Sequence, residues 1–160
     1  MFTGTLRFNL DPEGVVPDEE IESLLLKAQL QNILYGDPLG LDQEIQENGQ
    51  NLSSGERQLI CICRAILRKS KVVVLDEATA NIDMVTEQKV QALITTQFKG
   101  STMLTIAHRI NTIIESDRVL VLSFGQIKEF DSPANLMKNP DSEFSALIQE
   151  LKKEEEKENK

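Results

Sequence analysis

The sequence predicts an α/β fold in which helices pack on a parallel sheet. Two apolar runs, residues 72–75 and 104–107, have the pattern of strands that are buried on both faces. The segment between them carries apolar residues at helical spacing: Val90, Leu93, Ile94 and Phe98. A strand, a helix and a second strand in this order predict a βαβ unit, whose two strands are parallel.

Two helices are expected before this unit. Pro17 and the three acidic residues that follow it predict a helix start, because carboxylates stabilise the positive end of a helix dipole. The glycines and proline of residues 36–40 end this helix, and residues 43–50 predict a polar connector. The second helix is expected from Ser53 to about Arg68. The apolar faces consist of Ile21, Leu24, Leu25 and Ala28 in the first helix, and of Leu59, Ile62, Cys63, Ile66 and Leu67 in the second.

A hairpin and two further helices are expected after the second strand. Residues 118–124 and 126–130 flank Gly125 and predict two antiparallel strands. Ser132, which precedes a proline, and Ser142 are of the residue type that begins helices. The last helix is expected to pack through Phe144, Leu147, Ile148 and Leu151. Residues 152–160 are charged throughout apart from one asparagine, which predicts a fraying tail or a linker.

Composition narrows the classes of function. The chain has 160 residues, of which 40% are apolar and 27% charged, as in an ordinary globular domain. Its net charge of −9 argues against sequence-independent nucleic-acid binding, which needs clustered lysine and arginine. No apolar run approaches the roughly 20 residues that cross a bilayer, and no signal-peptide pattern is present, so a position on the cytosolic side is expected. Cys61 and Cys63 lie two apart in a predicted helix, which favours buried thiols over a disulfide or a zinc site.

Acidic residues follow the first predicted strand. Asp76 and Glu77 stand at its carboxyl end, where open α/β sheets place their ligand crevice. Unpaired carboxylates there favour a cation or a reaction, and a structural salt bridge is the alternative. Asp76 is interpreted as a Mg²⁺ residue and Glu77 as the group that polarises a water attacking a γ-phosphate. Asp83 and His108 follow the two strands and are expected at the same rim, which favours a catalytic histidine over a surface or core one.

The start of the second helix is a candidate anion site. Ser53 and Glu56 match the S-x-x-E capping box, and a simple helix cap is the alternative interpretation. A capped N-terminus still presents backbone N–H groups and a positive dipole end. Ser54 and Gly55 leave this start uncrowded, so that a phosphate can approach it.

Three segments in this order resemble motifs of ATP-binding-cassette (ABC) proteins. LSSGERQ is similar to the signature motif, VVVLDEATANID to Walker B with the D-loop, and TIAHR to the switch-histidine segment. FTGTLRFNLDP resembles the segment after the family's Q-loop and GQIKEFDSPANLM its C-terminal hairpin and helix, so the resemblance covers nearly the whole chain. The GTLRFNLDP segment is most similar to the second cassette of the multidrug-resistance-associated, or C, subfamily.

This resemblance implies a P-loop NTPase-like (RecA-like) parallel sheet with helices, together with the ABC helical subdomain. Residues 1–151 would be a partial nucleotide-binding domain. Within it, about 15–68 would be the helical and signature subdomain and about 71–151 the Walker B, switch-histidine and C-terminal part, followed by the tail 152–160.

The resemblance also implies a head-to-tail dimer of two cassettes with two ATP molecules at the interface. The signature residues Ser53, Ser54 and Gly55 would contact the γ-phosphate of the ATP bound to the partner cassette, with Leu52 and Gln58 shaping the helix start. Glu56 is also counted among the nucleotide-binding residues of this motif. In the second motif, Asp76 would serve Mg²⁺, Glu77 would be the general base, and Asp83 would cross the interface. His108 would form a hydrogen bond with the γ-phosphate and position the attacking water.

The sequence departs from the family pattern at two points. None of its eight glycines begins a G-x-x-x-x-G-K-[ST] P-loop, so the resemblance implies a cassette truncated on its N-terminal side. The isolated chain is then expected to bind ATP weakly or not at all, because the P-loop supplies the amides and the lysine that hold the phosphates. Glu56 stands where the signature usually has glutamine, and its capping role is expected to keep the carboxylate turned away from the phosphate.

Three functions stay open at this point. The leading one is an ATPase module of a membrane exporter, with a second cassette and the exporter's transmembrane helices as partners. The second is a soluble ABC-family ATPase of translation or DNA repair, against which GTLRFNLDP and the negative charge argue. The third is a non-catalytic interaction fragment that lends its signature helix to a partner.

Overall fold

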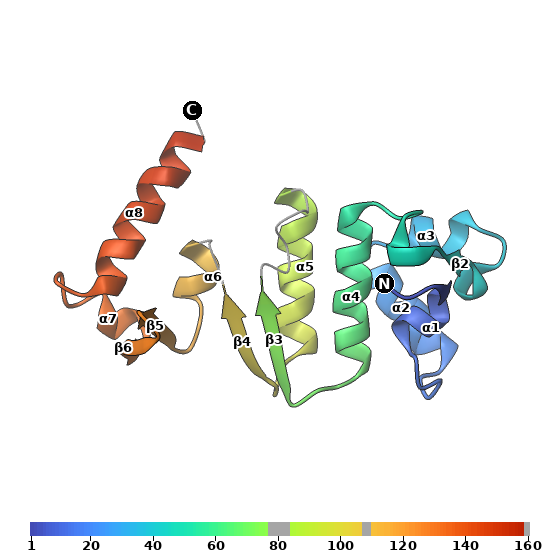
Figure 1. Ribbon diagram of the computed structural model, residues 1–160, viewed down its shortest axis with the longest axis horizontal. Helices are drawn as coiled ribbons and strands as arrows, with labels where there is room; N and C mark the ends of the chain where they lie inside the picture. The colour runs from blue at the N-terminus through green and yellow to red at the C-terminus, as the bar shows by residue number, and fades with distance from the viewer. Residues whose placement is uncertain (77–83, 107–109, 159–160) are drawn as a thin grey trace. The chain divides into compact units, whose positions relative to one another are not determined.

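This computed structural model describes residues 1–76, 84–106 and 110–158. The chain forms two compact units, Met1–Thr105 and Ile106–Lys160 (Figure 1). No helix within the described ranges is long and apolar enough to cross a membrane.

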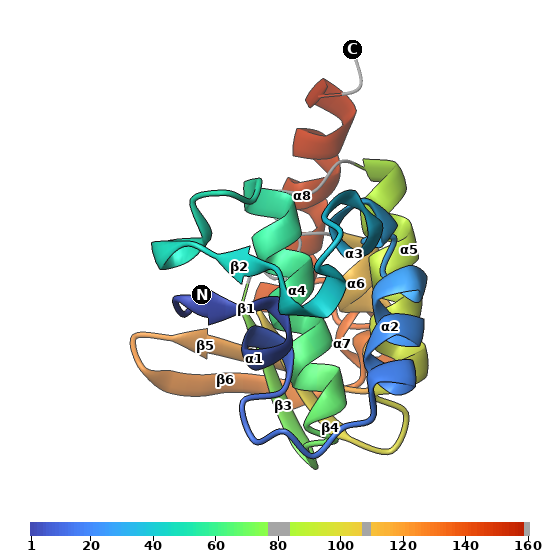
Figure 2. The same cartoon turned by 90° about the vertical axis from the view of Figure 1, so that its right-hand side faces the viewer.

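Helices dominate the first unit. In chain order it contains β1 (Gly4–Thr5), α1 (Leu6–Leu10), α2 (Asp18–Lys27), α3 (Gln31–Gly36), the 3₁₀ turn η1 (Gly40–Asp42), β2 (Glu44–Ile45), the 3₁₀ turn η2 (Glu47–Gly49), α4 (Ser54–Leu67), β3 (Val72–Asp76), α5 (Met84–Gln97) and β4 (Thr102–Ile106). The expected amphipathic helix is present as α4, which contacts α1, α2 and α5 (Figures 1 and 2). Its inward stripe is buried as predicted.

The first expected helix is two helices in the structure. α2 begins after Pro17, and its apolar face is buried as predicted. It ends at Lys27 because Gln29 adopts a left-handed φ of 60°. The Gln29 and Leu30 amides then donate to the carbonyls of Leu26 and Leu25 at 3.0 and 2.9 Å. This is a Schellman cap, and a glutamine in place of the usual glycine hides it in the sequence.

The expected polar connector contains a short strand. β2 pairs with β1 in antiparallel fashion, with Gly4 opposite Ile45 and Thr5 opposite Glu44. Ile45 is fully buried in the core of the unit. A strand of two residues is too short to show an alternating pattern.

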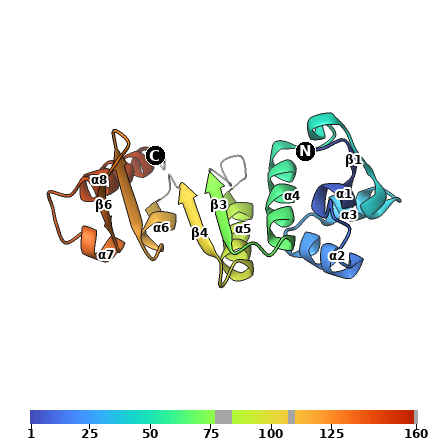
Figure 3. The same ribbon diagram turned by 60° about the horizontal axis from the view of Figure 1, so that its bottom comes forward.

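The predicted βαβ unit is present, and its two strands form a parallel pair (Figure 1). The Thr102 amide donates to the Lys71 carbonyl at 2.8 Å, where both strands begin. α5 covers one face, as Figure 3 shows, with Val90 and Ile94 fully buried. The α/β class is therefore confirmed. The expectation of burial on both faces is wrong for this chain, because successive side chains alternate and those facing away from α5 are bare: Val72, Val74, Leu104 and Ile106.

The second unit is built on the predicted hairpin. α6 (Ile110–Ile114) precedes β5 (Val119–Ser123) and β6 (Gln126–Asp131), which pair in antiparallel fashion, and α7 (Pro133–Leu136) and α8 (Glu143–Glu158) follow. Ser132 caps α7, as predicted, by accepting a hydrogen bond from the Asn135 amide at 3.3 Å. Ser142 caps α8, as predicted, by accepting from the Ser145 amide at 2.9 Å, and a second acceptor at this N-terminus was not predicted. The Glu129 carboxylate of β6 accepts from the Glu143 and Phe144 amides at 3.1 and 3.0 Å.

Two expectations for the last helix need correction. Leu147 is 44% exposed, whereas Phe144 and Ile148 are buried with Ile110 in the small core of this unit. The charged run was expected to fray, but α8 continues through residue 158. Lysine and glutamate are good helix formers, which favours a helix in this run.

Candidate functional site

The N-terminus of α4 carries the predicted capping box. The Ser53 hydroxyl oxygen accepts a hydrogen bond from the Glu56 amide at 3.2 Å. In return, Glu56 Oε2 accepts from the Ser53 amide at 2.8 Å and from the Ser53 hydroxyl at 2.7 Å. The carboxylate is therefore not turned away from the residue that is expected to meet a phosphate. It occupies that residue's two hydrogen-bond donors.

This helix start faces outward. Ser53 and Ser54 are exposed and Gly55 is half-buried, while Leu52 is only 8% exposed and anchors the segment in the core. Gln58 is half-buried one turn further along. The first amides of an α-helix have no intrahelical acceptor, and they lie at the positive end of the dipole. The arrangement can therefore receive an anion from outside the chain.

The loop before α4 is held by contacts that the sequence did not reveal. One guanidinium nitrogen of Arg57 donates to the carbonyls of Gly49 and Leu52 at 3.2 and 2.7 Å. Gly49 has φ of 68°, and a Cβ atom there would lie 2.9 Å from Arg57 Cδ, so both the backbone and the space require glycine. Asn51 donates to the Glu44 carbonyl at 2.9 Å. The backbone that leads into Ser53 is therefore held in place by side chains of the loop and of α4.

A buried asparagine joins the chain's first residues to the last turns of α4. Asn9 is fully buried, and its Oδ1 accepts from the Phe2 amide at 2.9 Å and from Arg64 at 3.2 Å. Its Nδ2 donates to the carbonyls of Phe2 and Thr5 at 2.8 and 3.1 Å. Arg64 also donates to the Asn9 carbonyl, and its guanidinium lies 5.3 Å from the centre of the Phe2 ring. The C-terminal turn of α4 is therefore bonded to the N-terminal segment of the chain.

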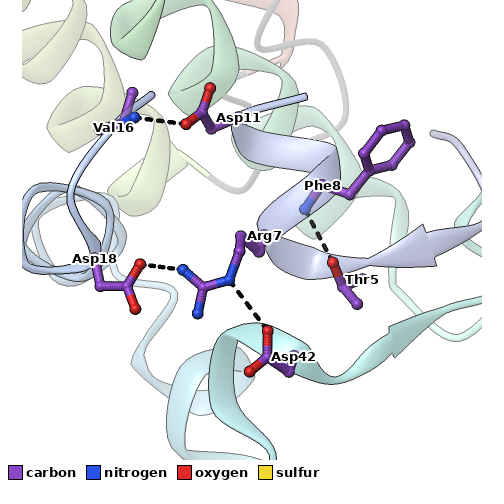
Figure 4. Close-up of polar contacts among 7 residues, drawn as sticks. All are labelled: Thr5, Arg7, Phe8, Asp11, Val16, Asp18 and Asp42. Carbon is purple, nitrogen blue, oxygen red and sulfur yellow. Dashed lines mark hydrogen bonds and ion pairs between the residues drawn. The ribbon is translucent and has the colours of Figure 1, made fainter. Parts of the chain in front are cut away.

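A half-exposed arginine links three elements around α1 (Figure 4). Arg7 donates to Asp18 at the start of α2 and to Asp42 of η1, the latter at 3.1 Å. The hydrogen bond to Asp18 is the main cause that raises the pKa of Arg7, followed by the one to Asp42. Thr5 caps α1 by accepting from the Phe8 amide at 3.0 Å. These contacts brace the helical part of the unit and add no group to the anion site.

Asp76 is the last residue of β3, and its side chain is exposed. β3 and α4 run in opposite directions, so the carboxyl end of β3 and the N-terminus of α4 face the same end of the first unit (Figure 1). The predicted partners Glu77, Asp83 and His108 lie outside the described residues. Among the residues that are described, no group of three or more acidic, histidine or cysteine side chains could hold a metal ion. An exposed carboxylate at a strand end still fits Mg²⁺, which prefers oxygen ligands.

The two thiols of α4 differ in environment. Cys63 is buried, as expected, whereas Cys61 is exposed, and both are free. The expectation of two buried thiols is wrong for Cys61, because side chains two positions apart on a helix point in nearly opposite directions. Burial raises the pKa of the Cys63 thiol to about 12, with a smaller contribution from Cys61.

A family model and the similar curated proteins all indicate the same protein family. A family model described as "ABC transporter" matches residues 6–80. The chain is 51% identical over 150 residues to "Putative ABC transporter C family member 15" of Arabidopsis thaliana, covering 94% of this chain and 14% of that protein. It is 46% identical over 155 residues to "ATP-binding cassette sub-family C member 4" of Homo sapiens, covering 97% of this chain and 12% of that protein. The chain thus spans less than a sixth of the length of these curated relatives.

A solved structure is similar over most of the chain. It is titled "Structure of a bacterial Atm1-family ABC exporter with ATP bound", with a TM-score of 0.81 and 28% sequence identity. The match covers 94% of this chain and 26% of that one.

Proposed function

The chain belongs to the ABC transporter family, and we propose that it is part of an ATP-binding and ATP-hydrolysing cassette in a longer membrane exporter, called the parent protein below. The observation that carries this proposal is the exposed and capped start of α4 within LSSGERQ. Its support is the identity to C-family members and the likeness to an exporter whose title names bound ATP. The parent protein's transmembrane helices and a second cassette are the proposed partners.

In this proposal, α4 completes the nucleotide site of the partner cassette. Ser53, Ser54 and Gly55 direct their amides and hydroxyls at the γ-phosphate of an ATP held by that partner. Leu52 anchors the segment, and Gln58 shapes the first turn. The N-terminus of a helix suits this role because the donors are fixed before the phosphate arrives.

The carboxyl ends of β3 and β4 serve the ATP of the chain's own cassette. Asp76 holds Mg²⁺, which neutralises charge on the phosphates when it is bound. Glu77 accepts a proton from the attacking water, and His108 hydrogen-bonds the γ-phosphate and orients that water. Asp83 contacts the partner cassette and couples the two sites.

Glu77→Gln in the parent protein tests the assignment of the base. The amide cannot accept the proton, so we expect ATP to stay bound while turnover falls by about 100-fold or more. Trapped nucleotide and phosphate release would be measured together. Glu115→Gln, the same change at an exposed position, is the matched control and should leave both unchanged. Unaltered turnover in Glu77→Gln would remove this residue from the mechanism.

The 160-residue chain by itself favours a second, narrower role. Its sequence has no G-x-x-x-x-G-K-[ST] pattern, yet the start of α4 is exposed and ordered. We therefore propose that the isolated chain binds MgATP weakly or not at all, but can lend α4 to a cassette that has its own P-loop. Calorimetric titration with MgATP checks the first part, and tight binding would contradict it. Hydrolysis restored to a cassette dimer with inactivated signatures would support the second part.

The exporter is distinguished from a soluble ABC-family ATPase by the rest of the parent protein. Apolar runs of about 20 residues ahead of this segment support the exporter. A second cassette or a coiled coil in a parent without such runs supports the soluble class instead.

A further inference from the structure

The side chain of Glu56 occupies the donors that the proposed phosphate needs. Its Oε2 accepts from both the amide and the hydroxyl of Ser53, at 2.8 and 2.7 Å. A serine hydroxyl has a single hydrogen to donate. Ser53 therefore cannot donate to a phosphate from its hydroxyl while it donates to Glu56.

The surrounding backbone leaves Glu56 as the group that can move. Arg57 holds the Gly49 and Leu52 carbonyls, and Gly49 packs against the Arg57 side chain with no room for a Cβ atom. Leu52 is buried immediately before Ser53. Glu56, in contrast, is only half-buried, so rotation of its side chain can take the carboxylate into solvent without disturbing the helix.

From this geometry we propose that the Glu56 carboxylate is an internal competitor of the γ-phosphate. It satisfies Ser53 in the empty cassette and leaves when the phosphate of the partner's ATP arrives. Both groups are anions that seek the same two donors, so they exclude each other by hydrogen bonding and by charge. Glu56 thereby sets the ATP concentration at which the two cassettes close. This inference rests on the proposed function of Ser53.

Glu56→Gln in the parent protein separates competition from simple capping. The amide oxygen of glutamine still accepts from the Ser53 amide, and its NH₂ group can donate to the Ser53 oxygen, which leaves the hydroxyl hydrogen for a phosphate. We expect the KM for MgATP to fall by about three- to tenfold, with kcat within about twofold of the original. A residue that only caps the helix would give an unchanged or a higher KM, and either result would overturn the proposal.

Two further variants make the result specific. Glu47→Gln removes the same charge from an exposed position of the preceding loop and should leave the KM unchanged. In a Ser53→Ala background, Glu56→Gln should lose its effect on the KM, because the contested donor is gone. A full effect in that background would show that charge alone acts, and would contradict competition for Ser53.

The same set distinguishes this inference from the proposed function. If Ser53→Ala alone leaves the KM and kcat unchanged, the assignment of the signature to a phosphate fails. If Ser53→Ala raises the KM while Glu56→Gln does not lower it, the assignment stands and only the competition is refuted.

Discussion

Asn9 uses every hydrogen-bonding position of its side chain inside the protein. Asn9→Ala would leave Arg64 and the Phe2 and Thr5 backbone groups, which are partly buried, without those partners. We expect the free energy of unfolding to fall by about 2 kcal/mol, from the cost of leaving these partly buried groups unsatisfied. Urea unfolding of the chain measures the loss. Asn32→Ala, at an exposed position of α3, is the control, and an equal loss there would contradict the role of Asn9.

The two thiols of α4 should react very differently. Thiolate is the reactive form, and burial raises the pKa of Cys63 from its ordinary 9.0 to about 12. At pH 8 an alkylating reagent should therefore modify Cys61 and leave Cys63 intact until urea unfolds the chain. Peptide mass spectrometry identifies the labelled site. With Cys61→Ser the folded chain should remain unlabelled, and rapid labelling of that variant would contradict the burial.

The raised pKa of Cys63 also predicts how the stability of the fold changes with pH. The folded state keeps a proton on Cys63 that the unfolded state loses above its ordinary pKa of 9.0. The contribution of this group is therefore fully present below about pH 9 and is lost as the pH rises toward 12. Comparison of the stability of the chain with that of Cys63→Ala across this pH range isolates the contribution of Cys63.

Local and distant contacts at the residue scale differ in how far the sequence predicts them. The Ser53 and Glu56 cap was predictable, because both partners lie within one turn. The contact between Asn9 and Arg64 was not, since it joins residues 55 positions apart and depends on how α1 packs on α4. Arg57 could have been suspected only from its place beside the capping box, because the carbonyls that it holds carry no sequence signal.

At the scale of elements, the hairpin between β5 and β6 has a turn whose sequence is not ideal. Phe124 and Gly125 both have positive φ, 50° and 73°, as a two-residue turn requires, yet Phe124 is fully exposed. Phe124→Asn should raise the free energy of unfolding by about 0.5–1 kcal/mol, because asparagine tolerates this backbone. Phe124→Val should lower it by about 1 kcal/mol, because a β-branched residue resists the left-handed region. Thermal unfolding of both variants gives the order, and the reverse order would contradict this turn.

The sequence predicted the elements with clear apolar periodicity and missed those whose signal depends on backbone conformation or distant pairing. Helices and strands with clear apolar periodicity, such as α4, α5 and β5, lie where they were expected. The division of α2 from α3 was missed because Gln29 adopts a conformation usually reserved for glycine. The pairing of β1 with β2 joins residues about 40 positions apart, and such short strands have no pattern of their own.

On the scale of the whole chain, apolar side chains are exposed on the β3–β4 sheet and on the β5–β6 hairpin. Val72, Val74 and Leu104 are each more than half exposed on the β3–β4 face that α5 does not cover. Leu120, Leu122 and Phe130 are 47–60% exposed on the hairpin of the second unit. Apolar patches of this kind promote association. The order of the motifs predicted a cassette. The strand patterns alone could not show that the described part of the chain leaves these side chains exposed.

Val74→Thr should therefore have a favourable effect in the isolated chain and an unfavourable effect in the parent protein. In the isolated chain the side chain is 66% exposed, so the change should reduce concentration-dependent self-association and alter the free energy of unfolding by less than about 0.5 kcal/mol. In the parent protein, where we expect further chain to cover this face, burying the new hydroxyl should cost about 1–2 kcal/mol. Sedimentation velocity and urea unfolding measure the two effects. Val73→Thr, at a position only 6% exposed, should destabilise both forms alike. If Val74→Thr changed the free energy of unfolding equally in both proteins, this face would be exposed in the parent protein as well. That result would contradict a cassette whose sheet is covered by residues outside this chain.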